Sequence, residues 1–291
     1  MANRRTFIQG SAALAAAAIA VPRFGAFAQS TPEASPAAAT PVVPVDISTL
    51  PLKTKGQLTI HADQPLYSPW FVDNAPSNGK GFEGSLAYAI AERLGFTKDQ
   101  VKWGYTSFNG SFAPGPKDFD FYMTEVSITA ARKEAVTFSA AYYKSPLTIV
   151  TKKGSKVLEA KTLADLRKFK FATQVGTTYF TYITETIKPT TDTLVLDQNS
   201  DTLQTLENDQ VDCVIQDRET AIFNTTIQFK DLAIAGILPG NPGDGMGLVF
   251  EQGNPLVAWV DSALASVIAD GTRDKLADQW LPKVEGVPSY S

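Results

Sequence analysis

The stretch SITAARKEAVTFSAAYY, residues 127–143, decides how the chain around it is interpreted. Thr129 is a good N-cap for a helix that begins at Ala130, because its hydroxyl can accept a hydrogen bond from the first turn. A capping box would place Glu or Gln where Arg132 stands, and a cation there opposes the helix dipole at a cost of about 0.3–1 kcal/mol. An anion bound at this helix start would offset the cost, since N–H groups, hydroxyls and a guanidinium would act on one negative charge. The alternative is an Arg132 that points into solvent.

Strands and helices alternate on both sides of this stretch. Before it, the sequence predicts a strand at residues 57–62 and a helix at 81–95, in which Leu86, Ile90 and Leu94 share one face. After it, the pattern restarts with short apolar strands between helical segments, at residues 170–174, 193–197 and 211–215. Such alternation is typical of mainly parallel sheets covered by helices. Because the pattern occurs twice, we expect an α/β fold of two lobes with a cleft between them.

Polar residues recur at the carboxyl ends of these strands, where open α/β sheets bind ligands. Ser127 lies on the same side of its strand as Thr129. Thr177 and Thr178 begin the helix after the strand at 170–174, where N–H groups and hydroxyls are again available. These groups, together with Arg132, suit a carboxylate or a phosphate.

Other side chains suit the remaining parts of a zwitterion. Asp217 follows the strand at 211–215, where it could receive an ammonium group or cap the next helix. Tyr67 and Phe108 lie in loops after early strands and could pack against the core or clamp an apolar stem. An anion site, a carboxylate and two aromatic walls together describe a zwitterion with a side chain.

The N-terminal residues 1–28 combine a basic start, an apolar run and a small-residue triplet at 26–28, which predicts a cleaved export signal. The pair Arg4-Arg5 resembles the twin-arginine signal, which carries folded cargo. Residues 29–52, rich in Pro, Ala, Ser and Thr, are predicted to be a linker. We therefore expect an extracytoplasmic protein, in the periplasm or at the outer face of the cell membrane.

The composition excludes several other classes of function. Without residues 1–28 the chain has 23 basic and 30 acidic residues, a net charge of −7, and no basic stripe that would indicate nucleic acid. Cys213 is the only cysteine and His61 the only histidine, so disulfides, zinc sites and histidine triads are not expected. Cys213 is interpreted as a small buried residue and His61 as a strand residue with a satisfied ring. We expect no metal and no cofactor.

Several segments together resemble the amino-acid-binding solute receptors of ABC importers, which are family 3 extracellular solute-binding proteins. They include GFEGSLAYAIAERLGF, FATQVGTTYF and VDCVIQDRETA, and the similarity covers about residues 56–282. The most specific block is SIT-x-x-R-K-x-x-V-x-FS-x-x-YY. The resemblance implies a type II periplasmic-binding-protein fold, in which a hinge of two strands joins two α/β lobes. Lobe 1 would comprise residues 53–147 and 245–291, and lobe 2 residues 148–244.

The resemblance also implies how a ligand is held at the strand ends. In this family Arg132 would bind the ligand's α-carboxylate bidentately. Ser127 and the N–H groups around Thr177 and Thr178 would help it. The lobes would close on the ligand by a hinge motion.

At the other end of the ligand, Asp217 would accept from the α-ammonium, and Tyr67 and Phe108 would sandwich the side chain. The chain departs from the family at Glu125, where a small residue such as Gly or Ser is usual. If the side chain of Glu125 points into the pocket, it favours a cationic ligand such as arginine or lysine over glutamate or aspartate.

The sequence thus predicts a binding protein that is not an enzyme. It would capture an L-amino acid with a polar or cationic side chain as a monomer and deliver it to the membrane subunits of an ABC importer. An exported enzyme similar to cyclohexadienyl dehydratases is the alternative, with Glu125 as general acid. A covalently attached sensory domain is a third class, for which no transmembrane or signalling segment follows Trp280.

Overall fold

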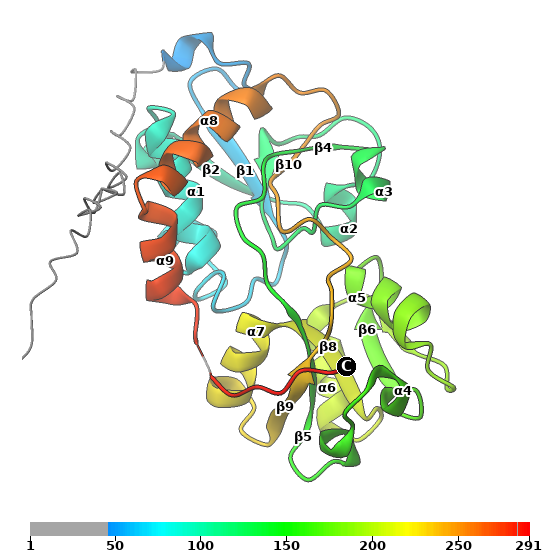
Figure 1. Ribbon diagram of the computed structural model, residues 1–291. Coiled ribbons are helices and arrows are strands. Elements are labelled where there is room, and N and C mark those ends of the chain that lie inside the picture. The colour runs from blue at the N-terminus through cyan, green and yellow to red at the C-terminus, as the bar shows by residue number, and fades with distance from the viewer. Residues whose placement is uncertain (1–45, 284) are drawn as a thin grey trace, which may run out of the picture. The chain divides into compact units, whose positions relative to one another are not determined.

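A computed structural model describes residues 46–283 and 285–291, all within a unit formed by residues 39–291. The predicted export signal and most of the predicted linker lie outside the described residues. Two five-stranded sheets organise the described part (Figure 1). In spatial order, the first sheet contains β2 (Val101–Tyr105), β1 (Leu58–Ala62), β3 (Phe121–Tyr122), β10 (Val249–Phe250) and β4 (Thr137–Phe138). The second contains β7 (Leu194–Leu196), β6 (Phe171–Gln174), β8 (Cys213–Asp217), β5 (Leu147–Lys152) and β9 (Leu232–Ile237).

Each sheet is mainly parallel, as the sequence predicted, but contains one antiparallel strand, β10 in the first sheet and β5 in the second. In the first sheet β1 pairs in parallel with β2 and β3, whereas β10 pairs antiparallel with β3 and β4. In the second, β6 is parallel to β7 and β8, and β5 is antiparallel to β8 and β9. The antiparallel strands β5 and β10 are those that begin after the chain crosses from one sheet to the other. The alternation of strands and helices does not reveal these crossings.

Helices cover both sheets and supply most of the core. Beside the first sheet lie α1 (Phe82–Arg93), α8 (Leu256–Ala269) and α9 (Thr272–Trp280), with the short helices α2 (Phe108–Ser111) and α3 (Ala130–Lys133). The second sheet carries α4 (Leu163–Leu166), α5 (Thr178–Thr181), α6 (Asn199–Glu207) and α7 (Arg218–Phe223). Two short π-helical turns, Tyr182–Ile187 and Asn224–Gln228, extend α5 and α7.

The helix α1 confirms the apolar periodicity that predicted it. Leu86, Ile90 and Leu94 are all buried in the core of the first lobe. The start of α1 is fixed by Gly81, which has φ +88°. A Cβ atom there would lie 2.3 Å from the backbone oxygen of Trp70, so no larger residue fits. This close approach holds the first turn of α1, including Glu83, against the loop that contains Trp70.

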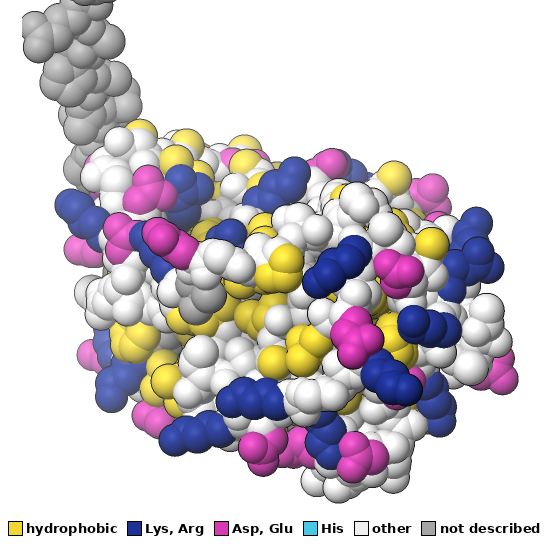
Figure 2. Space-filling model, turned by 60° about the horizontal axis from the view of Figure 1, so that its bottom comes forward, with side chains coloured by type: hydrophobic (Ala, Val, Ile, Leu, Met, Phe, Trp, Pro, Cys, Tyr) yellow, Lys and Arg dark blue, Asp and Glu magenta, His cyan; other side chains and the backbone are white. Residues whose placement is uncertain are grey.

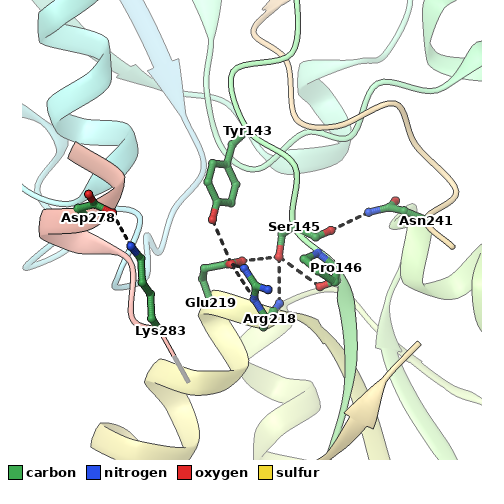
Figure 3. Close-up of polar contacts among 8 residues, drawn as sticks. All are labelled: Tyr143, Ser145, Pro146, Arg218, Glu219, Asn241, Asp278 and Lys283. Atoms are coloured by element: carbon green, nitrogen blue, oxygen red, sulfur yellow. Dashed lines mark hydrogen bonds and ion pairs between the residues drawn. The ribbon is translucent and has the colours of Figure 1, made fainter. Parts of the chain in front are cut away.

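Two crossing segments join the sheets and form the expected hinge, between β4 and β5 and between β9 and β10. The two segments are tied together by Asn241, whose Nδ2 donates to the carbonyl oxygen of Ser145 at 2.8 Å (Figure 3).

A third passage of the chain differs from the predicted division into lobes. The C-terminal residues were expected in the first lobe, but Ser289 forms a parallel bridge with Ile237 of β9. Tyr290 is buried in the core of the second lobe, directly against Gly236. The chain therefore ends on the second sheet after leaving α9, because Tyr290 buries an aromatic ring there.

The only cysteine and the only histidine of the chain have the environments that the sequence predicted. Cys213 is buried and free, and the ring of His61 contacts the hydroxyl of Thr106 at 2.8 Å through Nδ1. Within residues 46–283 and 285–291, no helix has both the length and the apolar character needed to cross a bilayer. No group of three or more His, Cys, Asp or Glu side chains in these residues is arranged to hold a metal ion. On the face seen in Figure 2, basic and acidic side chains are interspersed, with apolar side chains between them.

Candidate functional site

Arg132 lies where elements of the two lobes meet. Thr129 caps α3 as predicted, accepting from the backbone N–H of Arg132 at 3.2 Å. The guanidinium donates to the carbonyl oxygen of Ser127 at 2.7 Å and to that of Gly176, from the second lobe, at 2.9 Å. Its side chain is buried, with 8 % of the residue exposed. The alternative of an Arg132 that points into solvent is therefore wrong.

The guanidinium is also packed against aromatic rings. Its central carbon lies 4.2 Å from the ring centroid of Phe112 and 5.4 Å from that of Phe108. Burial lowers the pKa of Arg132 to about 10, so it is still charged near neutral pH. None of the ion pairs among the described residues involves Arg132. A guanidinium has five N–H donors, so this buried cation retains donors for an anion.

A cavity beside Arg132 brings together seven of the eight predicted site residues. They are Tyr67, Phe108, Glu125, Ser127, Arg132, Thr177 and Thr178. The hydroxyls of Ser127 and Thr178 lie 3.4 Å apart, across the two lobes. Thr177 caps α5 by accepting from the backbone N–H of Phe180 at 3.3 Å. The start of α5 and the guanidinium of Arg132 thus face one space.

Asp63 lines the same cavity, although the sequence reasoning did not select it. It follows β1 directly, at the carboxyl end of a strand, which is the signal that could have identified it. Its Oδ1 and the hydroxyl of Tyr67 are buried without a hydrogen-bond partner among the described residues. Burial raises the pKa of Asp63.

Asp217 is the predicted site residue that does not line the cavity. Its carboxylate accepts from the hydroxyl of Tyr179 at 2.9 Å, and Tyr179 lies between it and the cavity. Asp217 occupies the N-cap position of α7, but its side chain makes no capping hydrogen bond. Burial, with the nearby charges of Glu219 and Glu83, raises the pKa of Asp217 to about 8.

Glu125 lies in the wall of the cavity. It has φ +46°, a left-handed conformation that favours glycine. Its backbone N–H donates to Glu83 Oε1 at 2.7 Å, and its Oε2 accepts from the hydroxyl of Thr220 at 3.3 Å. Burial and the neighbouring Glu83 and Asp217 raise the pKa of Glu125 well above its ordinary value.

Glu83 is a second acidic residue that the sequence reasoning missed. It is fully buried at the start of α1 and accepts a hydrogen bond from the hydroxyl of Tyr142. Its other oxygen, Oε2, has no partner among the described residues. Burial raises the pKa of Glu83 to about 7. In the sequence an acid in a first helical turn is explained by the helix dipole, so nothing there indicated burial.

Comparison with known proteins identifies the family. Residues 58–283 match the family model described as bacterial extracellular solute-binding proteins, family 3. The chain belongs to this family. Because its members act outside the cytoplasm, this solute-binding protein is extracytoplasmic.

Individual relatives agree with that assignment. ABC transporter arginine-binding protein 1 of Escherichia coli strain K12 is 28% identical over 225 residues, which are 75% of this chain and 88% of the relative. The L-cystine-binding protein TcyJ of the same strain is 26% identical over 232 residues, 79% and 84% of the two chains.

Solved structures give the same fold. An ancestral arginine-binding protein bound to arginine has a TM-score of 0.65 and 28% identity, covering 78% of this chain and 99% of its own. An ancestral amino acid-binding protein described as a precursor of cyclohexadienyl dehydratase has a TM-score of 0.64 and 28% identity, covering 78% and 96%. The solute-binding protein therefore has the two-lobed type II periplasmic-binding-protein fold that the resemblance implied.

In this solute-binding protein hydrogen bonds connect the hinge to the carboxylate of Glu219 (Figure 3). Glu219, buried at the start of α7, accepts from the hydroxyl of Tyr143 at 3.1 Å and from Ser145 Oγ. The guanidinium of Arg218 donates to the same carboxylate at 2.7 Å and 3.0 Å. Across the lobes, Trp70 Nε1 donates to the hydroxyl of Thr220 at 2.7 Å. Residues of α7 therefore contact both the hinge, through Glu219, and the cavity wall, through the hydrogen bond from Thr220 to Glu125.

Proposed function

We propose that this solute-binding protein captures an α-amino acid with a cationic side chain, such as arginine or lysine, and delivers it to an ABC importer. The observation that carries the proposal is the charge of the cavity. One guanidinium, that of Arg132, and two carboxyl groups, those of Asp63 and Glu125, line it. A cationic amino acid has one carboxylate and two positive groups, which is the complementary set.

The carboxylate of the ligand would bind Arg132, whose guanidinium retains free donors between the two lobes. Carboxylates pair with guanidinium groups through two parallel hydrogen bonds. The hydroxyl of Ser127 and the helix start at Thr177 and Thr178 would add neutral donors on either side. This arrangement requires both lobes, because Ser127 and Thr178 lie on different ones, so it would favour hinge closure on the ligand.

The α-ammonium would face the carboxylates of Glu125 and, behind Tyr179, Asp217. The side chain of the ligand would then lie between Tyr67 and Phe108. Asp63 would receive its distal cation, since an oxygen of Asp63 is buried without a partner among the described residues. A second carboxylate on the ligand would instead meet Asp63 or Glu125, so we expect glutamate and aspartate to be rejected.

The relatives support an amino acid as the ligand but do not agree on its side chain. Their names specify arginine for one and L-cystine for another. We further propose that the protein acts as a monomer, that residues 1–28 are its export signal, of the twin-arginine type, and that residues 29–45 are a linker. The linker is shorter than the predicted 29–52, because Leu50 is buried in the core of the first lobe and Ile47 and Leu52 pack against it. In this proposal the moving lobes are residues 53–147 with 245–283, and residues 148–244 with the C-terminal tail.

A calorimetric titration tests the proposal with L-arginine and L-citrulline, which differ by the charge at the end of the side chain. We expect arginine to bind at least about 10-fold more tightly, because one charged hydrogen bond contributes about 1.5–3 kcal/mol. The Asp63→Asn variant should remove most of that preference. Equal affinities for arginine, citrulline and glutamate in the wild-type protein would contradict the proposal.

A second candidate function is a dehydration of a cyclohexadienyl substrate. Burial and neighbouring carboxylates raise the pKa of Glu125 well above its ordinary value, and a general acid must be protonated before it acts. The similar ancestral protein described as a precursor of cyclohexadienyl dehydratase is itself an amino acid-binding protein, so it relates the fold, and not this activity, to the enzyme. Turnover of prephenate or arogenate that is lost in Glu125→Gln would establish this activity. Saturable binding of amino acids, with neither compound consumed, would exclude it.

A further inference from the structure

Three carboxyl groups from both lobes gather around that of Glu125. Glu83 accepts from its backbone N–H at 2.7 Å, and Thr220, which donates to its carboxylate, follows Glu219 directly on α7. Asp217 ends β8 immediately before α7. These are the carboxyl cluster: Glu83, Glu125, Asp217 and Glu219.

Positive charge is scarce in the carboxyl cluster. Arg218 pairs with Glu219 at 2.7 Å, and this is the one ion pair that the cluster makes among the described residues. Arg132 lines the same cavity as Glu125, but its guanidinium donates to the carbonyl oxygens of Ser127 and Gly176. The four carboxyl groups of the cluster therefore have one positive neighbour, Arg218, to balance their charge.

The remaining groups that face the cluster are neutral donors. The hydroxyl of Tyr142 donates to Glu83 and that of Tyr179 to Asp217. Burial and the nearby carboxylates raise the pKa of both tyrosines well above the ordinary value, so they stay protonated. Tyr143 likewise donates to Glu219. Asp63 adds a further acid on the other side of the cavity.

An unpaired oxygen in the cluster is independent evidence that a positive group is missing. Glu83 is fully buried, and its Oε2 has no hydrogen-bond partner among the described residues. A buried acceptor without a partner is costly, and a proton or an ammonium group in the cluster would lower that cost. The cavity provides the route for one, because Glu125 lies in its wall.

We propose that Glu125 couples ligand capture to the release of a proton. In the empty protein a proton is held on the carboxyl group of Glu125 and shared with the cluster. When the ligand's ammonium group arrives, the O–H bond of that carboxyl breaks, the proton passes to the solvent, and the carboxylate pairs with the ammonium, which keeps its own three protons. This inference rests on the proposed function for the identity of the ligand, but not for the proton held by the empty protein.

The coupling gives Glu125 a part in specificity. A ligand without an ammonium group, such as a deaminated carboxylic acid, would leave the proton in place. Its affinity would therefore not increase with pH, whereas that of the amino acid would. A small uncharged residue at this position could not make this distinction by charge.

Titration calorimetry with L-arginine in two buffers of different ionisation enthalpy, at about pH 6 to pH 8, tests the proposal. The wild-type protein should release a proton on binding, and its affinity should rise with pH, by up to about tenfold per unit for one proton. Glu125→Gln should release none and bind with nearly constant affinity. Glu92→Gln is the matched control, because Glu92 is exposed on α1. Equal proton release by wild type and Glu125→Gln would overturn the proposal.

A second measurement needs no ligand and so separates this inference from the proposed function. Thermal unfolding of the empty wild-type protein should lose stability between about pH 5 and pH 8, since a folded state that holds a proton loses stability as the pH rises. Glu125→Gln, or Glu125→Gly, which suits the left-handed backbone, should lose less. If these variants show the same pH dependence as wild type, the proton is not held by Glu125, whichever ligand binds.

Discussion

Replacing Glu83 with Gln should change how the stability of the protein depends on pH. Glu83 is fully buried, and burial raises its pKa from 4.5 to about 7. Such a group binds more protons in the folded than in the unfolded state between these values, so its contribution to stability is present at low pH and is lost as the pH rises through about 7. The shift corresponds to about 3 kcal/mol, at about 1.4 kcal/mol per unit.

Gln is a conservative replacement here, because its amide oxygen can still accept from Tyr142 and from the backbone N–H of Glu125. It has no proton to lose. We therefore expect the unfolding free energy of wild type to fall more steeply than that of Glu83→Gln, by about 2 kcal/mol between pH 5 and pH 8. Glu125 and Asp217 leave a residual slope in both proteins, so the difference between the curves is the quantity to compare.

Urea unfolding at about pH 5, 6, 7 and 8 measures this difference. The exposed Glu92→Gln variant of the same helix controls for the loss of one surface charge and should run parallel to wild type. If Glu83→Gln also runs parallel to wild type, Glu83 is ionised in the folded protein at the same pH as in the unfolded chain. Its burial would then have no electrostatic cost, and the reasoning would be refuted.

Three further changes test other parts of the structure. Arg132→Met should keep the packing against Phe112 but weaken amino-acid binding at least about 100-fold, because two charged hydrogen bonds at about 1.5–3 kcal/mol each are lost. Titration calorimetry measures the affinity, and an unchanged affinity would show that Arg132 does not bind the ligand. Trp70→Phe removes the hydrogen-bond donor to Thr220 across the lobes. The average separation of the lobes in the empty protein should then increase, which small-angle scattering measures. An unchanged scattering curve would mean that this hydrogen bond does not keep the lobes together. Tyr290→Ala should lower the unfolding free energy by about 3 kcal/mol in urea, and a loss within experimental error would show that the C-terminal tail contributes nothing to the second lobe.

The sequence was most informative where a local rule was broken. Arg132 stands out in the sequence because a cation in a first helical turn opposes the helix dipole. In the structure its side chain is buried at the cavity and does not point into solvent. The two α/β lobes could also be predicted, because the periodicity of apolar residues in each strand and helix is a local property of the sequence. The antiparallel strands β5 and β10 were missed because strand direction depends on where the chain crosses between lobes.

The acidic residues around the site were harder to predict. Glu83 and Glu125 lie 42 positions apart and meet only through folding. Glu125 was selected only through the resemblance to the family, and nothing in the local pattern around Glu83 marks it. Asp217 lies at the end of a strand, as its position in the sequence indicated, but the side chain of Tyr179 from α5 lies between it and the cavity. Tyr290 was placed in the wrong lobe because the sequence gives no sign of which core an isolated aromatic residue joins.

The central claim is that the protein binds an α-amino acid through its carboxylate at Arg132. The most direct test compares L-arginine with agmatine, which keeps the ammonium and guanidinium groups but lacks the carboxylate. By titration calorimetry with the wild-type protein, arginine should bind at least about 100-fold more tightly, for the two charged hydrogen bonds to Arg132. Equal affinities for arginine and agmatine would contradict the account.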